Sequence, residues 1–129
     1  MNISELTGGS TAHWADTLTV KNLFTERFNG CRCHTAFPDQ LHTFVGDCSS
    51  ENLFVAMVPE GDVRFPSNKY NQESIVAVVG RHVSADYLDY LEERDISYIF
   101  GGEDGCDMET VMYHLRKDFG VNKLVCVAS

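Results

Sequence analysis

A chain of 129 residues is long enough for one domain with a buried core, and 43% hydrophobic against 22% charged residues excludes a disordered chain. The formal net charge of −9 argues against nucleic acids and anionic membranes as partners, since phosphate backbones are bound by clustered Lys and Arg. No apolar run approaches the roughly 20 residues that span a bilayer, and the N-terminus lacks a signal-peptide pattern. We therefore expect a cytoplasmic protein, and its five cysteines, an odd number, favour free thiols.

The first 50 residues carry little regular pattern. A helix-like stretch covers residues 19–28, and residues 30–42, GCRCHTAFPDQLH, hold several candidate metal ligands. Structural zinc sites usually place two to four residues between the first two cysteines, whereas one residue separates Cys31 from Cys33. This spacing argues against zinc, so we predict no metal site. The other candidate ligands are His34, His42 and Cys48.

Two apolar runs of strand length open the second part of the chain. Residues 52–58, NLFVAMV, are followed by the turn PEGD and a short extended VRF. Residues 74–79, SIVAVV, form a continuous apolar run that ends at Gly80. A run of this kind suggests a strand buried on both faces, as in a parallel sheet.

Two helices and two further strands are predicted beyond these runs. Residues 84–95 form a helix with Ser84 as its N-cap, and residues 96–100, ISYIF, form the next strand. Residues 107–120 show apolar side chains at helical spacing and end at a glycine. The final strand covers residues 123–127.

The order from residue 51 to residue 129 is therefore β–β–α–β–α–β with short links. Parallel strands joined by right-handed helical crossovers are the economical arrangement for this order. We predict a single α/β domain over residues 1–129, with a mostly parallel sheet, flanking helices and a poorly defined N-terminal part over residues 1–50.

Ligands of open parallel sheets lie beyond the carboxyl ends of the strands, and small residues follow several of these ends here. Gly80, Gly101 and Gly102 let a ligand approach the backbone, and Pro59 follows the first strand. Arg81 is the cation at this edge and is suited to a phosphate monoester. The alternative is that the glycines only form connecting loops and that Arg81 points to water.

No catalytic group is assigned by these patterns. The acidic runs LEERD and GGEDGCD are typical of a solvated face and a helix entry, and they offer no convincing acid–base pair of carboxylates. His114 is expected on the polar side of the last helix, in contact with water. The catalytic residues are therefore left unknown.

Residues 52–128 resemble a known family through the segment ISYIFGGEDG, the amphipathic helix that follows and ends in FG, and the closing apolar strand. The family is the reductase domain of bacterial riboflavin biosynthesis, which has a dihydrofolate-reductase-like, Rossmann-like three-layer fold. The resemblance implies that NADPH lies across the carboxyl edge of the sheet. It also implies that its adenosine end is flanked by Pro59, Gly80, Arg81, Gly101 and Gly102.

The chain departs from the family pattern at both ends. Members continue from the last strand into a glycine-rich turn against the cofactor pyrophosphate, where this chain has Ala128 and Ser129. The opening strand of the family is not found in this sequence, and a turn that holds phosphates survives only in altered form around Arg32. We therefore expect an incomplete domain with an open sheet edge beside its last strand, covered by the N-terminal segment, a second copy or another chain.

Three functions remain open. The first is a truncated or divergent NADPH-dependent reductase that transfers hydride to a ribosylamino-pyrimidine-like substrate, as the resemblance implies. The alternative is a non-catalytic relic or protein-interaction module that keeps the α/β core. The third is a small zinc- or thiol-binding protein built on residues 31–48.

Overall fold

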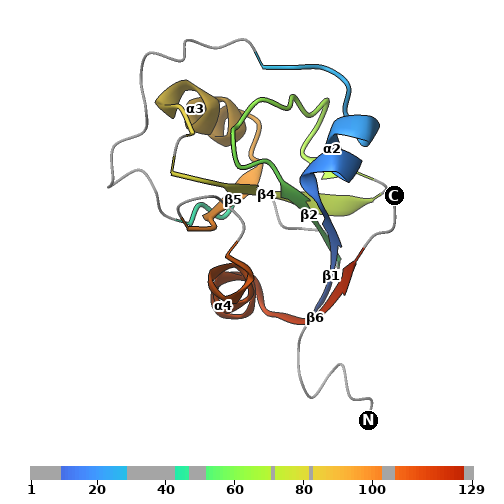
Figure 1. The fold of residues 1–129 in the computed structure, drawn as a ribbon. Helices are drawn as coiled ribbons and strands as arrows, with labels where there is room; N and C mark the ends of the chain where they lie inside the picture. Colours follow the sequence, from blue (N-terminus) through green and yellow to red (C-terminus); the bar gives the residue numbers. More distant parts are fainter. Residues whose placement is uncertain are drawn as a thin grey trace.

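The computed structural model describes residues 10–28, 43–46, 52–70, 72–81, 83–102 and 107–126. Within these residues the chain forms one sheet with helices on both of its faces (Figure 1). The elements are β1 (Ser10–Ala15), α2 (Thr17–Leu23), β2 (Leu53–Met57), β3 (Lys69–Tyr70), β4 (Glu73–Val79), α3 (Ala85–Glu93), β5 (Ser97–Phe100), α4 (Met108–Phe119) and β6 (Val121–Cys126).

The sheet is mostly parallel. Its parallel strands follow the order β5-β4-β2-β1-β6, and the short β3 runs antiparallel to the first residues of β4. At the outer side of β5, Phe44 forms an antiparallel bridge with Tyr98. At the opposite margin of the described sheet, β6 pairs with β1. The prediction of an α/β chain with a mostly parallel sheet is therefore confirmed.

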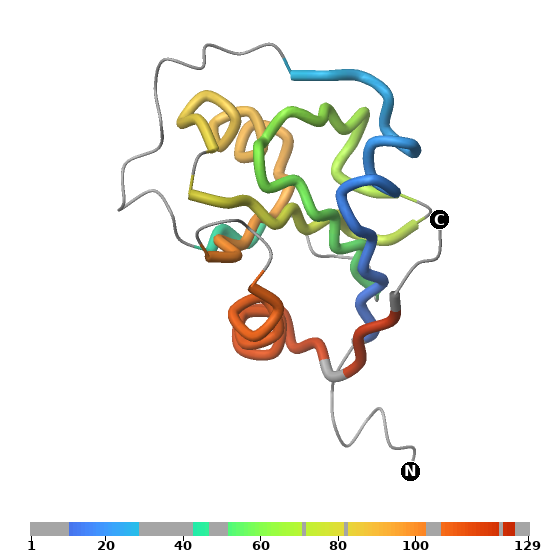
Figure 2. Tube along the Cα trace, in the orientation of Figure 1, coloured from blue at the N-terminus to red at the C-terminus, as the bar shows by residue number. Residues whose placement is uncertain are grey.

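Alternate residues of the central strands face two separate apolar cores. On β2, Phe54 and Ala56 pack into the core shared with α2 and α3, whereas Leu53 and Val55 pack into the core shared with α4. Figures 1 and 2 show α2 and α3 on one side of the sheet and α4 on the other. The described chain therefore has three layers, and burial on both faces explains why its central strands are continuously apolar.

The two longer helices begin and end as their sequences predict. The Ser84 side chain accepts a hydrogen bond from the Tyr87 backbone N–H, and Asp107 accepts one from the Glu109 backbone N–H. Gly120 ends α4 with a positive φ of 68°. None of the helices in the described ranges has the length and apolar character needed to cross a bilayer.

The N-terminal part departs most from the sequence prediction. The sequence pattern indicates no strand before residue 50, yet β1 lies between β2 and β6, with Ala12 and Ala15 completely buried. The helix expected over residues 19–28 begins earlier, since Asp16 accepts a hydrogen bond of 2.8 Å from the Thr19 backbone N–H. Alanine is a poor strand former, so the sequence of β1 gives little local indication of a strand. Pairing with β2 and β6 determines where β1 lies.

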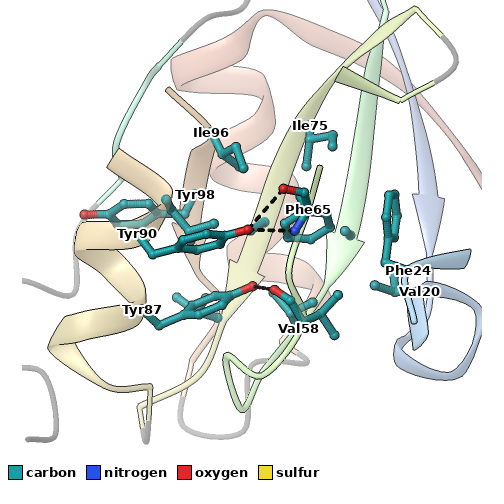
Figure 3. Packing of buried hydrophobic residues seen from close by; sticks show 14 of the residues in the cluster. Val20, Phe24, Val58, Phe65, Ile75, Tyr87, Tyr90, Ile96 and Tyr98 are labelled. Atoms are coloured by element: carbon teal, nitrogen blue, oxygen red, sulfur yellow. Dashed lines mark hydrogen bonds between the residues drawn. The ribbon is translucent and has the colours of Figure 1, made fainter. Parts of the chain in front are cut away.

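Two tyrosines of α3 fix the loop that follows β2 (Figure 3). The Tyr87 hydroxyl donates to the Val63 carbonyl oxygen. The Tyr90 hydroxyl accepts a 2.9 Å hydrogen bond from the Phe65 N–H and donates a 3.1 Å bond to the Phe65 carbonyl oxygen. Both rings are buried, so these bonds satisfy polar groups that water does not reach. The loop is thereby held against α3.

We expect the free energy of unfolding to fall above about pH 10, the ordinary pKa of tyrosine. Burial raises the pKa of Tyr87 well above that value, and burial together with the hydrogen bond to Glu92 raises the pKa of Tyr98. A raised pKa in the folded state favours folding while the phenol is protonated. The contribution is therefore complete below about pH 10 and is lost as the pH rises toward the folded-state pKa values.

Urea unfolding at about pH 8 and about pH 11 measures this loss, since the two conditions bracket the ordinary pKa. The Tyr98→Phe variant lacks one of the two hydroxyls and is expected to lose less stability between the two conditions than the wild type. Equal losses in the two proteins would contradict the role of Tyr98.

Candidate functional site

The carboxyl ends of the parallel strands lie at one edge of the sheet, which we call the carboxyl rim. Pro59 lies just beyond the end of β2, Gly80 and Arg81 follow β4, and Gly101 and Gly102 follow β5. Because β4 lies between β2 and β5, the structure brings these five predicted site residues to the tips of three adjacent strands. The other two predicted site residues, Arg32 and Ser129, lie outside the described residues.

Backbone hydrogen bonds join these tips. The Gly80 N–H donates to the Pro59 carbonyl oxygen at 3.1 Å, and the Gly101 N–H donates to the Val79 carbonyl oxygen at 2.9 Å. The Gly101 carbonyl oxygen accepts a 2.9 Å bond from the N–H of Asp107, which precedes α4. The tips of β2, β4 and β5 are therefore held at defined positions, and α4 begins beside the tip of β5.

The chain leaves β4 and β5 toward opposite faces of the sheet. After β4 it enters α3, whose residues pack into one core, and after β5 it enters α4, whose residues pack into the other. In the order β5-β4-β2-β1-β6, the strand order reverses between β1 and β6, and such a reversal is the topological switch point of an open α/β sheet. Gly80 and Gly101 lie at the tips of β4 and β5 on the same carboxyl edge, away from this point.

A glycine is required at Gly102. Its φ is +88°, and a Cβ atom there would lie 3.1 Å from the Asp107 Cβ. The structure therefore explains this glycine by local backbone geometry, independently of any ligand. Arg81, at the tip of β4, is an exposed residue.

The helix N-termini at the carboxyl rim are capped by the chain itself. Asp16, Ser84 and Asp107 accept hydrogen bonds from backbone N–H groups in the first turns of α2, α3 and α4. The bond from the Thr19 N–H lowers the pKa of Asp16, so its carboxylate stays ionised. Two of these helix N-termini therefore carry a carboxylate, which disfavours a further negative charge beside them.

The zinc hypothesis falls outside the described residues, where Cys31, Cys33, His34, His42 and Cys48 are placed. Within the described ranges, no group of three or more His, Cys, Asp or Glu side chains is arranged to hold a metal ion. The function assigned to the carboxyl rim therefore does not depend on a bound metal ion.

Two histidines outside the set of predicted site residues form side-chain contacts in the structure. On β1, the His13 Nδ1 is 2.5 Å from the Oε2 of Glu73, at the start of β4. On α4, the His114 Nδ1 lies 3.1 Å from both the Asp118 Oδ2 and the Thr43 Oγ1. His114 is half-buried, whereas the sequence predicts a solvated position for it. Of its two contacts, the sequence indicates only the one with Asp118, through the i, i+4 spacing on the helix.

Comparison of the chain with family models, curated proteins and solved structures found no match. The family resemblance is therefore neither supported nor opposed by any relative. A functional assignment depends on the geometry of the carboxyl rim together with the sequence segments described above.

Proposed function

We propose that this chain binds NADPH at the carboxyl rim and is a divergent reductase of the riboflavin-biosynthesis, dihydrofolate-reductase-like type. One observation carries the proposal: Pro59, Gly80 and Gly101 lie together at the tips of three adjacent parallel strands, at the carboxyl edge of the sheet. Open α/β sheets bind ligands beyond the carboxyl ends of their strands, and glycines allow the ligand to approach the backbone.

The residues of the rim have separable roles in this proposal. Arg81 binds a cofactor phosphate through its guanidinium, and Gly80 and Gly101 let the cofactor approach the tips of β4 and β5. The self-capped helix N-termini contribute little, so we expect weaker binding than in sites where the pyrophosphate lies on a free helix N-terminus. Bound NADPH supplies the hydride, while the chain orients the nicotinamide and its substrate. The resemblance adds Arg32 and Ser129 as further contacts.

Thermal unfolding in the presence of NADPH tests the proposal. Ligand at about 100 times its Kd stabilises a folded protein by about 2.7 kcal/mol, which raises the Tm by several degrees for a domain of this size. Arg81→Ala is expected to weaken NADPH binding about tenfold or more, because a hydrogen bond to a charged group is lost. Arg116→Ala removes the same charge from the exposed side of α4 and is expected to bind like the wild type.

A wild-type Tm that is unchanged at millimolar NADPH would overturn the proposal. Equal weakening by Arg81→Ala and Arg116→Ala would show a general charge effect instead of a site at Arg81. Either result favours the second candidate, a non-catalytic interaction module. Its specific support is that Asp16 and Asp107 occupy helix N-termini that a phosphate otherwise uses.

A further inference from the structure

One side of α4 forms an open groove of about 560 Å³ on the surface of the described chain, lined by Glu109, Met112, Tyr113, Arg116 and Lys117. Met112 and Tyr113 follow Glu109 by three and four residues, and the two basic residues follow Tyr113 by the same intervals. All five therefore share one side of the helix. Among the described helices only α4 lies on this face of the sheet, so no other described helix covers the groove (Figure 1).

The middle of the groove is apolar. Tyr113 is 56% exposed, although it carries a large aromatic ring. Met112 packs against the core between α4 and the sheet and also reaches the groove. Contact of these side chains with water is unfavourable, so a partner surface that covers them is stabilised by the hydrophobic effect.

The two ends of the groove carry opposite charges. Glu109 lies in the first turn of α4, and Arg116 and Lys117 lie in its last turn. The Lys117 Nζ lies 5.4 Å from the centroid of the Tyr113 ring, which holds this cation beside the groove. Glu109 and Arg116 form no ion pair with a described residue, and about 10 Å of helix separates them. Both charges are therefore available to a partner.

This order of side chains is complementary to itself. In a second α4 that runs antiparallel, with a two-fold axis between Met112 and Tyr113, position 109 of one helix faces position 116 of the other. Glu109 then meets Arg116 at two equivalent places, and Met112 of each copy meets Tyr113 of the other. A two-fold dimer requires a surface of this self-complementary kind, and antiparallel helices also align their dipoles favourably.

We propose that the groove binds a second copy of this chain, so that two copies form a two-fold dimer through antiparallel α4 helices. A single pair of short helices buries less than the roughly 1,200 Å² at which stable interfaces begin, so we expect a transient dimer with a Kd of about 0.1–1 mM. Dimerisation does not depend on NADPH binding at Arg81. At micromolar protein concentrations the dimer is dissociated, so Arg116→Ala remains a control for NADPH binding and for unfolding.

Sedimentation velocity from about 10 μM to about 1 mM protein tests the proposal, with a reducing agent that prevents cross-links between cysteines. The wild type is expected to shift from monomer to dimer over this range. Glu109→Arg and Arg116→Glu each place like charges opposite each other at both contacts, and each is expected to raise the Kd at least about tenfold. An equimolar mixture of these two variants restores opposite charges at every contact, so we expect it to dimerise like the wild type.

Two further variants separate the groove from general effects. Glu93→Arg makes the same charge change on an exposed residue of α3 and is the matched control. Both glutamate variants bring the net charge of −9 closer to zero, which by itself favours association, so weakening by Glu109→Arg is specific to the groove. Tyr113→Ala removes the apolar middle without a change of charge and is expected to raise the Kd at least about fivefold. It keeps the test decisive if circular dichroism shows that a charged variant has lost its helices.

A wild type that stays monomeric at about 1 mM would overturn the proposal and leave the groove to another occupant. Equal effects of Glu109→Arg and Glu93→Arg would also refute it. A wild-type dimer that Tyr113→Ala leaves unchanged, or a mixture of the two charge variants that stays monomeric, would place the contact elsewhere on the chain.

Discussion

Replacement of Leu115 by alanine is expected to lower the free energy of unfolding by about 2–5 kcal/mol. Leu115 lies on α4 and is completely buried in the core that also contains Val55 and Ile99. The smaller side chain leaves a cavity that close-packed neighbours fill only in part, so packing contacts are lost in addition to the hydrophobic transfer energy.

Urea unfolding followed by circular dichroism measures this loss. Arg116→Ala is the matched control, because it changes the next residue on the exposed side of the same helix and is expected to change stability by no more than about 0.5 kcal/mol. A loss below about 1 kcal/mol for Leu115→Ala would mean that α4 does not pack on the sheet. The placement of α3 and α4 on opposite faces of the sheet would then be wrong.

Gly61→Ala is expected to destabilise the protein by about 2–5 kcal/mol, for two reasons. The φ of Gly61 is +63°, a conformation that costs a residue with a Cβ about 1–2 kcal/mol. The new Cβ would also lie 2.7 Å from the Val83 Cγ2 and 2.9 Å from the Tyr87 Cδ2. Tyr87 cannot move freely, because its hydroxyl is bonded to the Val63 carbonyl oxygen.

Gly120→Ala separates these two costs. Gly120 has a similar φ of +68°, but a Cβ there would meet nothing within 4 Å, so only the backbone cost of about 1–2 kcal/mol is expected. The difference between the two variants in thermal or urea unfolding measures the crowding at Gly61. Equal losses would contradict the packing of the loop after β2 against α3, beside the carboxyl rim.

Much of the fold after residue 50 was predictable from local pattern. β2 and β4 are continuous apolar runs, and such runs are typical of strands that are covered on both faces. Helix α4 carries both its helical spacing and its caps in the sequence. The candidate site residues at the carboxyl rim followed from these elements, because parallel strands end at the same edge and glycine bounds two of them.

The sequence by itself determined the two helices and the parallel strands after residue 50, but not the short β3, and it showed that glycines follow β4 and β5. Only the tertiary structure decided that β1 lies inside the sheet, that β5 lies at its margin, and that Arg64 and Arg94 each pack against the Tyr90 ring. The physical reason is how far apart in the chain the interacting residues lie. Helix caps, apolar runs and turns express interactions between near neighbours in the chain. Strand order and the contacts of distant side chains depend instead on how crossovers and sheet register bring remote segments together.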